Sequence, residues 1–164
     1  MIRDSRAPKL LGDFGEGLAT YVLLSQGFEV AVVDHVGADL IAVRDRHRLA
    51  ISVKTRLFRS GSTEHHSITI ENDHLGKLDR FADRFGMTPV FCHVVSLADA
   101  GVIHVFLLPV ALLREGTLLP TNETGFSLRF HKPQDLERLA THPSLGYARF
   151  TQNELRPLPF PSIL

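Results

Sequence analysis

The sequence predicts an α/β fold with a central mixed sheet of about five strands flanked by helices. Three observations favour it: an amphipathic helical pattern comes first, three β-branched runs with short turns follow, and a second helical pattern precedes two more strands. The chain has 164 residues, of which 44% are hydrophobic, which suffices for one compact core. We therefore expect a single domain over 1–164, with its core at about 12–108 and a C-terminal extension at 109–164.

The first helix is predicted between Gly12 and Gly27. Phe14, Leu18 and Val22 recur at intervals of four and therefore share one helix face. Glycine commonly ends a helix because it adopts a left-handed backbone conformation without steric cost, and Gly27 follows the last apolar position.

Three strands are predicted next, because β-branched residues gather in the runs 28–34, 39–44 and 48–56. The intervening segments 36–38 and 45–47 have the lengths of tight turns, which predicts an antiparallel meander. Side chains alternate along a strand. The third strand should therefore have a core face of Leu49, Ile51 and Val53 and an opposite face of Ala50, Ser52, Lys54 and Arg56.

A second helix is predicted after a polar stretch from 58 to 67. It begins with Asn72 or Asp73 as its cap and ends at Gly86, since its apolar positions recur at intervals of three and four. Two strands follow, at 89–96 and 102–108. The rest is less regular, with a helical turn at 109–113, an extra edge strand at 127–130, a helix at 133–141 and a proline-rich tail at 156–161.

The overall charge excludes a general electrostatic attraction to nucleic acid or to an anionic membrane. Lysine and arginine together number 18, as do aspartate and glutamate, so any affinity for phosphate must be local. A single cysteine, Cys92, excludes a disulfide within the chain. No basic and apolar leader begins the sequence and no apolar run approaches the roughly 18 residues of a membrane span, so we expect a cytoplasmic protein without membrane partners.

Three polar residues of the predicted hairpin should converge on one site. Ser52 and Lys54 point to the same side of their strand, and Asp39 begins the preceding strand of the hairpin, so its carboxylate should lie near Lys54. Glu16 lies in the first helix. Phosphodiester hydrolysis needs hard oxygen ligands for magnesium or manganese and a cation that orients or activates water. Asp39 and Lys54 suit these two roles.

The element order and these residues resemble the PD-(D/E)XK nuclease superfamily over roughly residues 12 to 96. Gly15-Glu16, Asp39 and Ser52-Val53-Lys54 fall where the motifs of that family should lie, and Holliday junction resolvase-type domains are the most similar. The resemblance implies a restriction-endonuclease-like core, DNA as substrate, Mg or Mn as cofactor, and often a homodimer. It implies that Glu16 supports the metal site, that Asp39 and the backbone carbonyl of Val53 are ligands, and that Lys54 is catalytic.

Ser52 departs from the family pattern, in which an acidic residue or glutamine normally precedes the lysine by two positions. Some restriction enzymes of the superfamily carry Ser-Val-Lys and relocate the missing glutamate to the next helix. Glu71, or less plausibly Glu64, would be the relocated acid here. A hydroxyl brings no charge to offset dehydration of magnesium, so metal binding is weak without such an acid.

Basic residues near the motifs are candidates for contact with DNA phosphates. They are Lys9 in the amino-terminal segment and Arg56 and Arg59 after the catalytic lysine, although solvated surface charge explains them equally well. The adjacent histidines at 65–66 lack the spacing of a structural zinc site. His93 and His104 lie in apolar strands and are expected to be core residues.

The sequence leaves two principal functions open. The first is a metal-dependent endonuclease that hydrolyses DNA. The second is a domain of the same fold that has lost catalysis and binds nucleic acid or protein. A third reading is that the resemblance is accidental and that the meander simply supports a dimer interface. For the homodimer that the resemblance implies, the apolar segment 102–113 would supply the interface.

Overall fold

The structure is a computed structural model that describes residues 6–58, 67–116, 118–119, 121–122, 125–129 and 133–151. Its main sheet has six strands in the order β1-β2-β3-β5-β6-β9, and a small sheet has the order β4-β8-β7. In the main sheet β3 and β5 are parallel and the other neighbours are antiparallel. The elements are α1 (Ala7–Ser25), β1 (Glu29–His35), β2 (Ala38–Arg44), β3 (His47–Phe58), β4 (Ser67–Glu71), α2 (Asn72–Phe85), β5 (Thr88–Leu97), β6 (Val102–Pro109), α3 (Val110–Arg114), β7 (Thr121–Asn122), β8 (Gly125–Arg129), α4 (Pro133–Thr141) and β9 (Gly146–Thr151).

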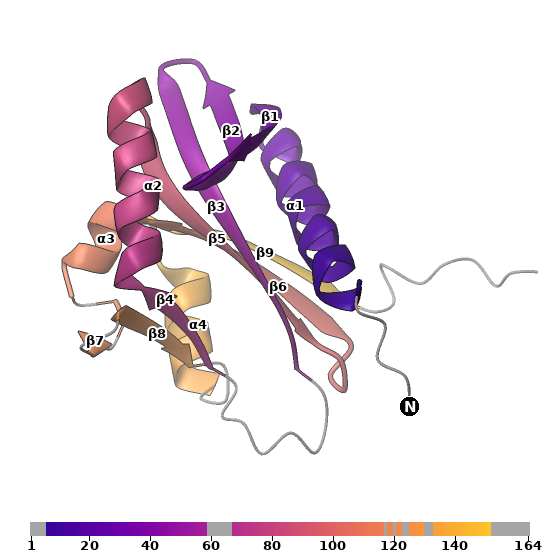
Figure 1. The fold of residues 1–164 in the computed structure, drawn as a ribbon. Helices are drawn as coiled ribbons and strands as arrows, with labels where there is room; N and C mark the ends of the chain where they lie inside the picture. Colours follow the sequence, from indigo (N-terminus) through magenta and orange to yellow (C-terminus); the bar gives the residue numbers. More distant parts are fainter. Residues whose placement is uncertain are drawn as a thin grey trace, which may run out of the picture.

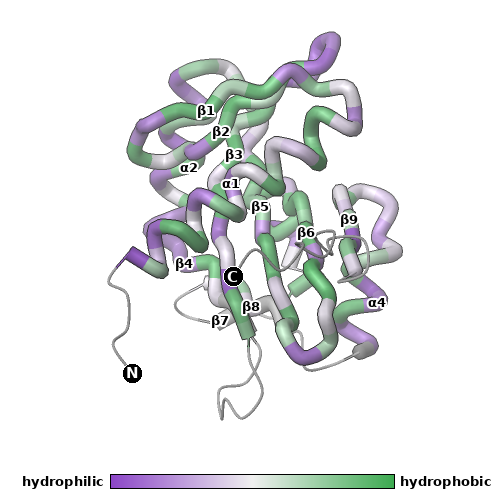
Figure 2. Tube along the Cα trace, turned by 90° about the vertical axis from the view of Figure 1, so that its right-hand side faces the viewer, coloured by the Kyte–Doolittle hydropathy of each residue, from purple (hydrophilic) through white to green (hydrophobic). Residues whose placement is uncertain are grey.

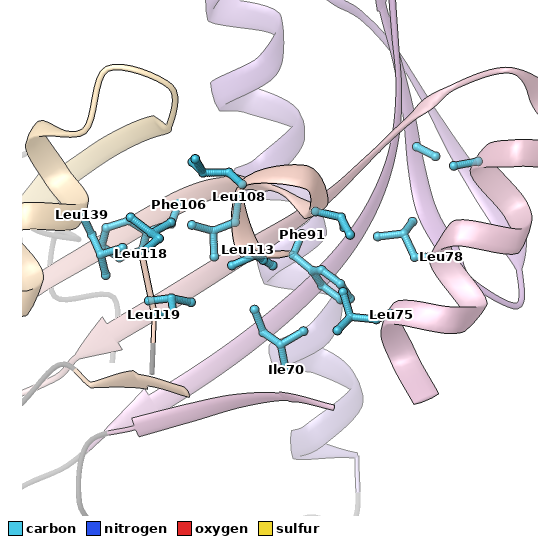
Figure 3. Packing of buried hydrophobic residues seen from close by; sticks show 14 of the residues in the cluster. Ile70, Leu75, Leu78, Phe91, Phe106, Leu108, Leu113, Leu118, Leu119 and Leu139 are labelled. Atoms are coloured by element: carbon cyan, nitrogen blue, oxygen red, sulfur yellow. The ribbon is translucent and has the colours of Figure 1, made fainter. Parts of the chain in front are cut away.

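The main sheet is covered on both faces (Figure 1). α1 packs on one face, where its buried side chains meet Leu40, Ile51 and Cys92. α2, α3, α4 and the small sheet pack on the other, and Leu75 and Leu78 of α2 point toward Phe91 of β5 (Figure 3). The central strands β5 and β6 are accordingly hydrophobic along much of their length (Figure 2). Within the described residues, no helix combines the length and the apolar character that crossing a bilayer requires.

The prediction that one face of β3 points away from the core is wrong. Ala50 is fully buried and Ser52 is only 7% exposed, although both lie on the face opposite Ile51. The reason is the parallel pairing of β3 with β5: such a pair needs a crossover, and α2 in that crossover covers the second face. Lys54 therefore lies in the middle of a strand covered on both faces, and it is half-buried.

Other elements differ from their predictions in extent or number. The expected five-strand sheet has a sixth strand, β9, at its edge. The two sides of β9 pack against different hydrophobic clusters, so hydrophobic and polar residues do not alternate regularly along it. β4 was not predicted, and β8, expected as an edge strand at 127–130, lies between β4 and β7. α1 begins five residues before Gly12, because proline is tolerated in its first turn, and Glu71 rather than Asn72 or Asp73 is the N-cap residue of α2.

The segment 102–113 does not supply an exposed apolar interface. β6 lies between β5 and β9, and Phe106, Leu108 and Leu113 are fully buried. Large exposed apolar side chains occur instead along α1, at Leu10, Phe14, Tyr21 and Leu24. The predicted tail 156–161 lies outside the described residues.

Gly15 allows α1 to approach β3 closely, just before the glutamate at position 16. A Cβ at Gly15 would overlap Oγ1 of Thr55 and would lie only 3.0 Å from Cβ of Thr55. Thr55 is buried, and within the described residues its hydroxyl has no hydrogen-bond partner. The contact therefore brings the helix backbone down onto the strand that carries Ser52 and Lys54.

Gly15→Ala is expected to lower the free energy of unfolding by about 1 to 3 kcal/mol, because an added methyl group overpacks this contact. Gly17→Ala is the matched control, since within the described residues a Cβ there would meet no atom within 4 Å apart from the neighbouring residues and the backbone of its own helix. The control should gain about 1 kcal/mol from helix propensity alone. Urea denaturation of both variants measures the difference, and equal stabilisation of both would contradict the close α1–β3 contact.

Candidate functional site

The candidate site begins where β2 and β3 separate. Their register pairs Leu40 with Ile51 and ends there, so Asp39 stands opposite Ser52 at the opening of a fork. Oδ2 of Asp39 accepts a hydrogen bond from the backbone N–H of Val53 at 2.6 Å and one from the Ser52 hydroxyl at 3.2 Å. The carboxylate thus accepts the hydrogen bond that the Val53 N–H would otherwise donate to a carbonyl group of a neighbouring strand. Within the described residues, Oδ1 of Asp39 accepts no hydrogen bond.

A hollow of about 220 Å³, which we call the Asp39 hollow, opens at this fork. The β1–β2 turn, β3 and the first half of α2 form its walls. Lys54 contributes to the lining and makes no hydrogen bond or ion pair with the described residues, so its ammonium group is available to a ligand. The full lining is His35, Val36, Gly37, Asp39, Ser52, Lys54, His74 and Lys77.

Glu16 approaches the same region from α1. Its side chain is half-buried, and it is not part of the lining of the Asp39 hollow. Burial raises the pKa of Glu16, and the negative charges of Asp39 and Asp13 raise it further, whereas Lys9 lowers it. Asp39 and Glu16 are therefore close enough to interact electrostatically, and a cation between them would relieve their repulsion.

The oxygen atoms at the fork suit a magnesium or manganese ion that keeps several of its waters. Oδ1 of Asp39 is available, and the carbonyl of Val53 points to the fork, because the N–H and C=O of a strand residue face the same side. Magnesium is commonly held by one or two carboxylates together with substrate phosphate and water. The described residues contain no group of three histidine, cysteine, aspartate or glutamate side chains placed to bind a metal. Asp39, with Glu16 as the second charge, is thus a minimal donor set.

Glu71, the preferred candidate for the relocated acid, does not lie in the Asp39 hollow. It is exposed at the N-cap of α2. Glu64 and the histidines at 65–66 lie outside the described residues. Ser52 therefore remains the side chain at the usual acidic position, and its hydroxyl donates to Asp39 instead of binding a metal through a negative charge.

Two of the three basic residues predicted to contact DNA, Lys9 and Arg56, lie on different elements outside the Asp39 hollow. Lys9 lies at the exposed start of α1, where it forms an ion pair with Asp13 at 3.1 Å. Arg56 is exposed, two residues beyond Lys54. Arg59 lies outside the described residues.

The lining contains histidine and lysine side chains that the sequence analysis did not select. His35 precedes the turn at Gly37, while His74 and Lys77 lie on α2 beside its apolar stripe. Gly37 has a φ of 116° and a Cβ there would lie 2.5 Å from the carbonyl oxygen of Lys77, so the turn presses directly on the backbone of α2. This contact joins distant segments, and no local sequence pattern predicts it.

His93 is fully buried next to Lys54, with which it is in register on the neighbouring strand. Within the described residues neither ring nitrogen has a hydrogen-bond partner, so the expectation of an ordinary core residue holds for its burial but not for its polar atoms. Burial lowers the pKa of His93 to about 3, with further lowering by the charges of Lys54 and Arg56. The folded protein therefore holds this imidazole neutral.

His93→Leu is expected to reduce the acid sensitivity of the fold. Between pH 6.5 and 3 the unfolded chain binds a proton at His93 that the folded chain does not, so stability falls as the pH decreases. Between pH 7 and pH 5 the free energy of unfolding should therefore fall by about 2 kcal/mol more in the unaltered protein than in the variant. Urea denaturation at pH 7 and pH 5 measures this difference in stability. His47→Leu, which removes an exposed histidine, is the control. If the stability of the unaltered protein and that of His93→Leu depend on pH in the same way, the expectation is wrong.

Comparison with known proteins supports the predicted fold. No protein-family model and no curated protein sequence matches this chain. The solved structure of Hjc, a Holliday junction resolvase from the archaeal hyperthermophile Archaeoglobus fulgidus, is similar with a TM-score of 0.54 and 22% identity, over 73% of this chain and 84% of the resolvase. The bacterial homing endonuclease I-Ssp6803I gives a TM-score of 0.48 and 15% identity, over 79% of this chain and 86% of its own. The similarity to the resolvase shows that this chain has a restriction-endonuclease-like fold.

Proposed function

We propose that this protein is a metal-dependent endonuclease that hydrolyses phosphodiester bonds in DNA. One observation carries the proposal: Asp39, Ser52 and Lys54 line a single hollow at the fork between β2 and β3. The similar fold of an archaeal Holliday junction resolvase adds support and makes branched DNA a reasonable first substrate to test. Fold similarity alone does not assign an activity, which must come from the site.

Each residue of the proposed site has a distinct task. Asp39 and the Val53 carbonyl would hold magnesium or manganese, and the metal would supply positive charge at the phosphate and make a bound water more acidic. The Val53 N–H and the Ser52 hydroxyl fix the Asp39 carboxylate through Oδ2 and leave Oδ1 for this task. Glu16 contributes a second negative charge, and Lys54 neutralises charge that develops on the phosphate and orients the attacking water.

A second function is favoured by the side chain at position 52. With serine there and with no three-residue metal cluster in the described part of the chain, metal affinity depends largely on Asp39. A nuclease-like domain that binds DNA without cutting it would have such a site. In either case DNA is the proposed partner, and a homodimer that cuts two strands would need a surface other than the buried segment 102–113.

The two functions differ in a cleavage assay. Purified protein should be incubated with single-stranded, duplex and four-way-junction DNA, in magnesium, in manganese and in chelator. The nuclease proposal expects cleavage of at least one DNA form with metal and none with chelator. Well-folded protein that binds DNA but leaves all three forms intact with either metal would support the binding domain and refute the nuclease.

A further inference from the structure

A second hollow of about 230 Å³ adjoins the Asp39 hollow along α2. We call it the α2 hollow. The two share His35, Val36 and Lys77, so they lie side by side along the first turns of the helix. The lining of the α2 hollow is His35, Val36, Lys77, Arg80, Phe81 and Arg84.

The charged side chains that line the α2 hollow are basic. Lys77, Arg80 and Arg84 contribute three cations and no acidic side chain lines it. Within the described residues Arg80 and Arg84 form no ion pair. Lys77 pairs with Asp73 at 2.6 Å, but both side chains are substantially exposed, and such a pair contributes little stability that a ligand would have to replace. In a chain with equal numbers of acidic and basic residues, this concentration of positive charge is local.

The spacing of these cations fits a phosphate backbone. Positions 77, 80 and 84 lie on one side of α2, and from the first to the last the helix rises about 10 Å at 1.5 Å per residue. One strand of duplex DNA rises about 3.4 Å per phosphate, so the row spans about three nucleotides. Cations at such a spacing can contact successive phosphates of a single strand.

The opposite wall of the α2 hollow is the β1–β2 turn, which packs against α2. His35 packs edge-on against Phe81 with ring centroids 4.9 Å apart, and its Nδ1 lies 2.8 Å from the Val36 carbonyl oxygen. The close contact of Gly37 with the Lys77 backbone holds the same turn against the helix. A ligand in the α2 hollow therefore meets cations on one side and the packed turn on the other, and the adjoining hollow contains Asp39 and Lys54.

We propose that Lys77, Arg80 and Arg84 form a track that binds the sugar-phosphate backbone of the DNA strand entering the Asp39 hollow. We call these three residues the α2 track. The track rests on the proposed function for its ligand, but it assigns DNA contact to α2 rather than to Lys9, Arg56 and Arg59. It carries no base specificity, because its contacts are to phosphate.

The test measures DNA binding in chelator, so that it does not depend on cleavage. Fluorescence anisotropy of labelled duplex and four-way-junction DNA between about 50 and 200 mM salt gives the affinity and its salt dependence. Arg80→Gln and Arg84→Gln should each weaken binding about tenfold at 0.1 M salt and lower the salt slope by about one. Arg149→Gln, an exposed charge on β9 outside both hollows, is the charge-matched control and should change neither.

The outcomes separate the track from the nuclease proposal. If Arg80→Gln and Arg84→Gln, with unchanged circular dichroism, bind DNA as tightly as the unaltered protein, or if Arg149→Gln weakens binding equally, the track is refuted. Unaltered protein that binds neither DNA also refutes it. If the two variants lose affinity while the unaltered protein cuts no DNA with either metal, the track stands and the nuclease proposal falls.

Discussion

Lys54→Met is expected to lower the rate of DNA cleavage by about 10²- to 10⁴-fold, the range that one positioned acid–base group contributes. Methionine keeps the stem that packs in the middle of β3 but removes the ammonium group, which makes no hydrogen bond or ion pair with the described residues. Stability should therefore change little. Single-turnover cleavage at saturating DNA measures the rate, and circular dichroism with urea denaturation measures the fold.

Lys77→Met is the control for Lys54→Met, because it removes the same charge from the lining of the same hollow. If Lys54 acts on the reacting phosphate and Lys77 only holds the strand, the control should raise KM while kcat changes by less than about tenfold. Equal losses of kcat in both variants would mean that the Asp39 hollow needs positive charge in general and that Lys54 has no special role in the reaction.

Ser52→Glu is expected to raise the affinity for manganese by at least about tenfold, since each added carboxylate strengthens a hard-cation site. The Ser52 hydroxyl lies 3.2 Å from Oδ2 of Asp39, so a glutamate there brings two carboxylates together. Without metal their repulsion should lower stability, and with metal the loss should be reversed, because a ligand that binds only the folded state stabilises it. Thermal unfolding with and without manganese, together with titration calorimetry, measures both effects.

Ser52→Gln separates the charge of the new side chain from its size. Glutamine fills the same space beside Asp39, so it should disturb packing at this 7% exposed position as much as glutamate, without adding affinity for metal. If manganese shifts the unfolding temperatures of Ser52→Glu and Ser52→Gln equally, the fork between β2 and β3 is not a metal site, and the proposal of Asp39 as a ligand loses its support.

The elements with strong local patterns were predictable from the sequence. The apolar stripe of α2 repeats at intervals of three and four, and its predicted bounds agree closely with Asn72–Phe85. The β1–β2–β3 meander was likewise predictable from its short turns. β9 was not predicted because its six residues pack against both hydrophobic clusters. Its hydrophobic residues therefore recur neither at the spacing of a helix nor at every second position, as they would in a strand with one buried face.

The sequence predicted only the part of the site that two strands adjacent in the sequence, β2 and β3, form. Asp39, Ser52 and Lys54 belong to one hairpin, and the alternation rule correctly placed Ser52 and Lys54 on one face. The remaining walls come from α2, and their position depends on the parallel pairing of β3 with β5 across the whole crossover. That pairing also buries Ser52, which the hairpin alone leaves exposed. Contacts of this kind have no signature in a short window of sequence.

The contact between Gly15 and Thr55 constrains how the sequence can diverge. A chain that keeps α1 this close to β3 must keep a very small residue immediately before the helical glutamate, whereas position 52 lines the Asp39 hollow and is not subject to this contact. Homologues that keep this contact should thus share the glycine-glutamate pair, whichever residue stands at position 52. A search pattern built on that pair would detect members that a pattern requiring an acidic residue at position 52 excludes.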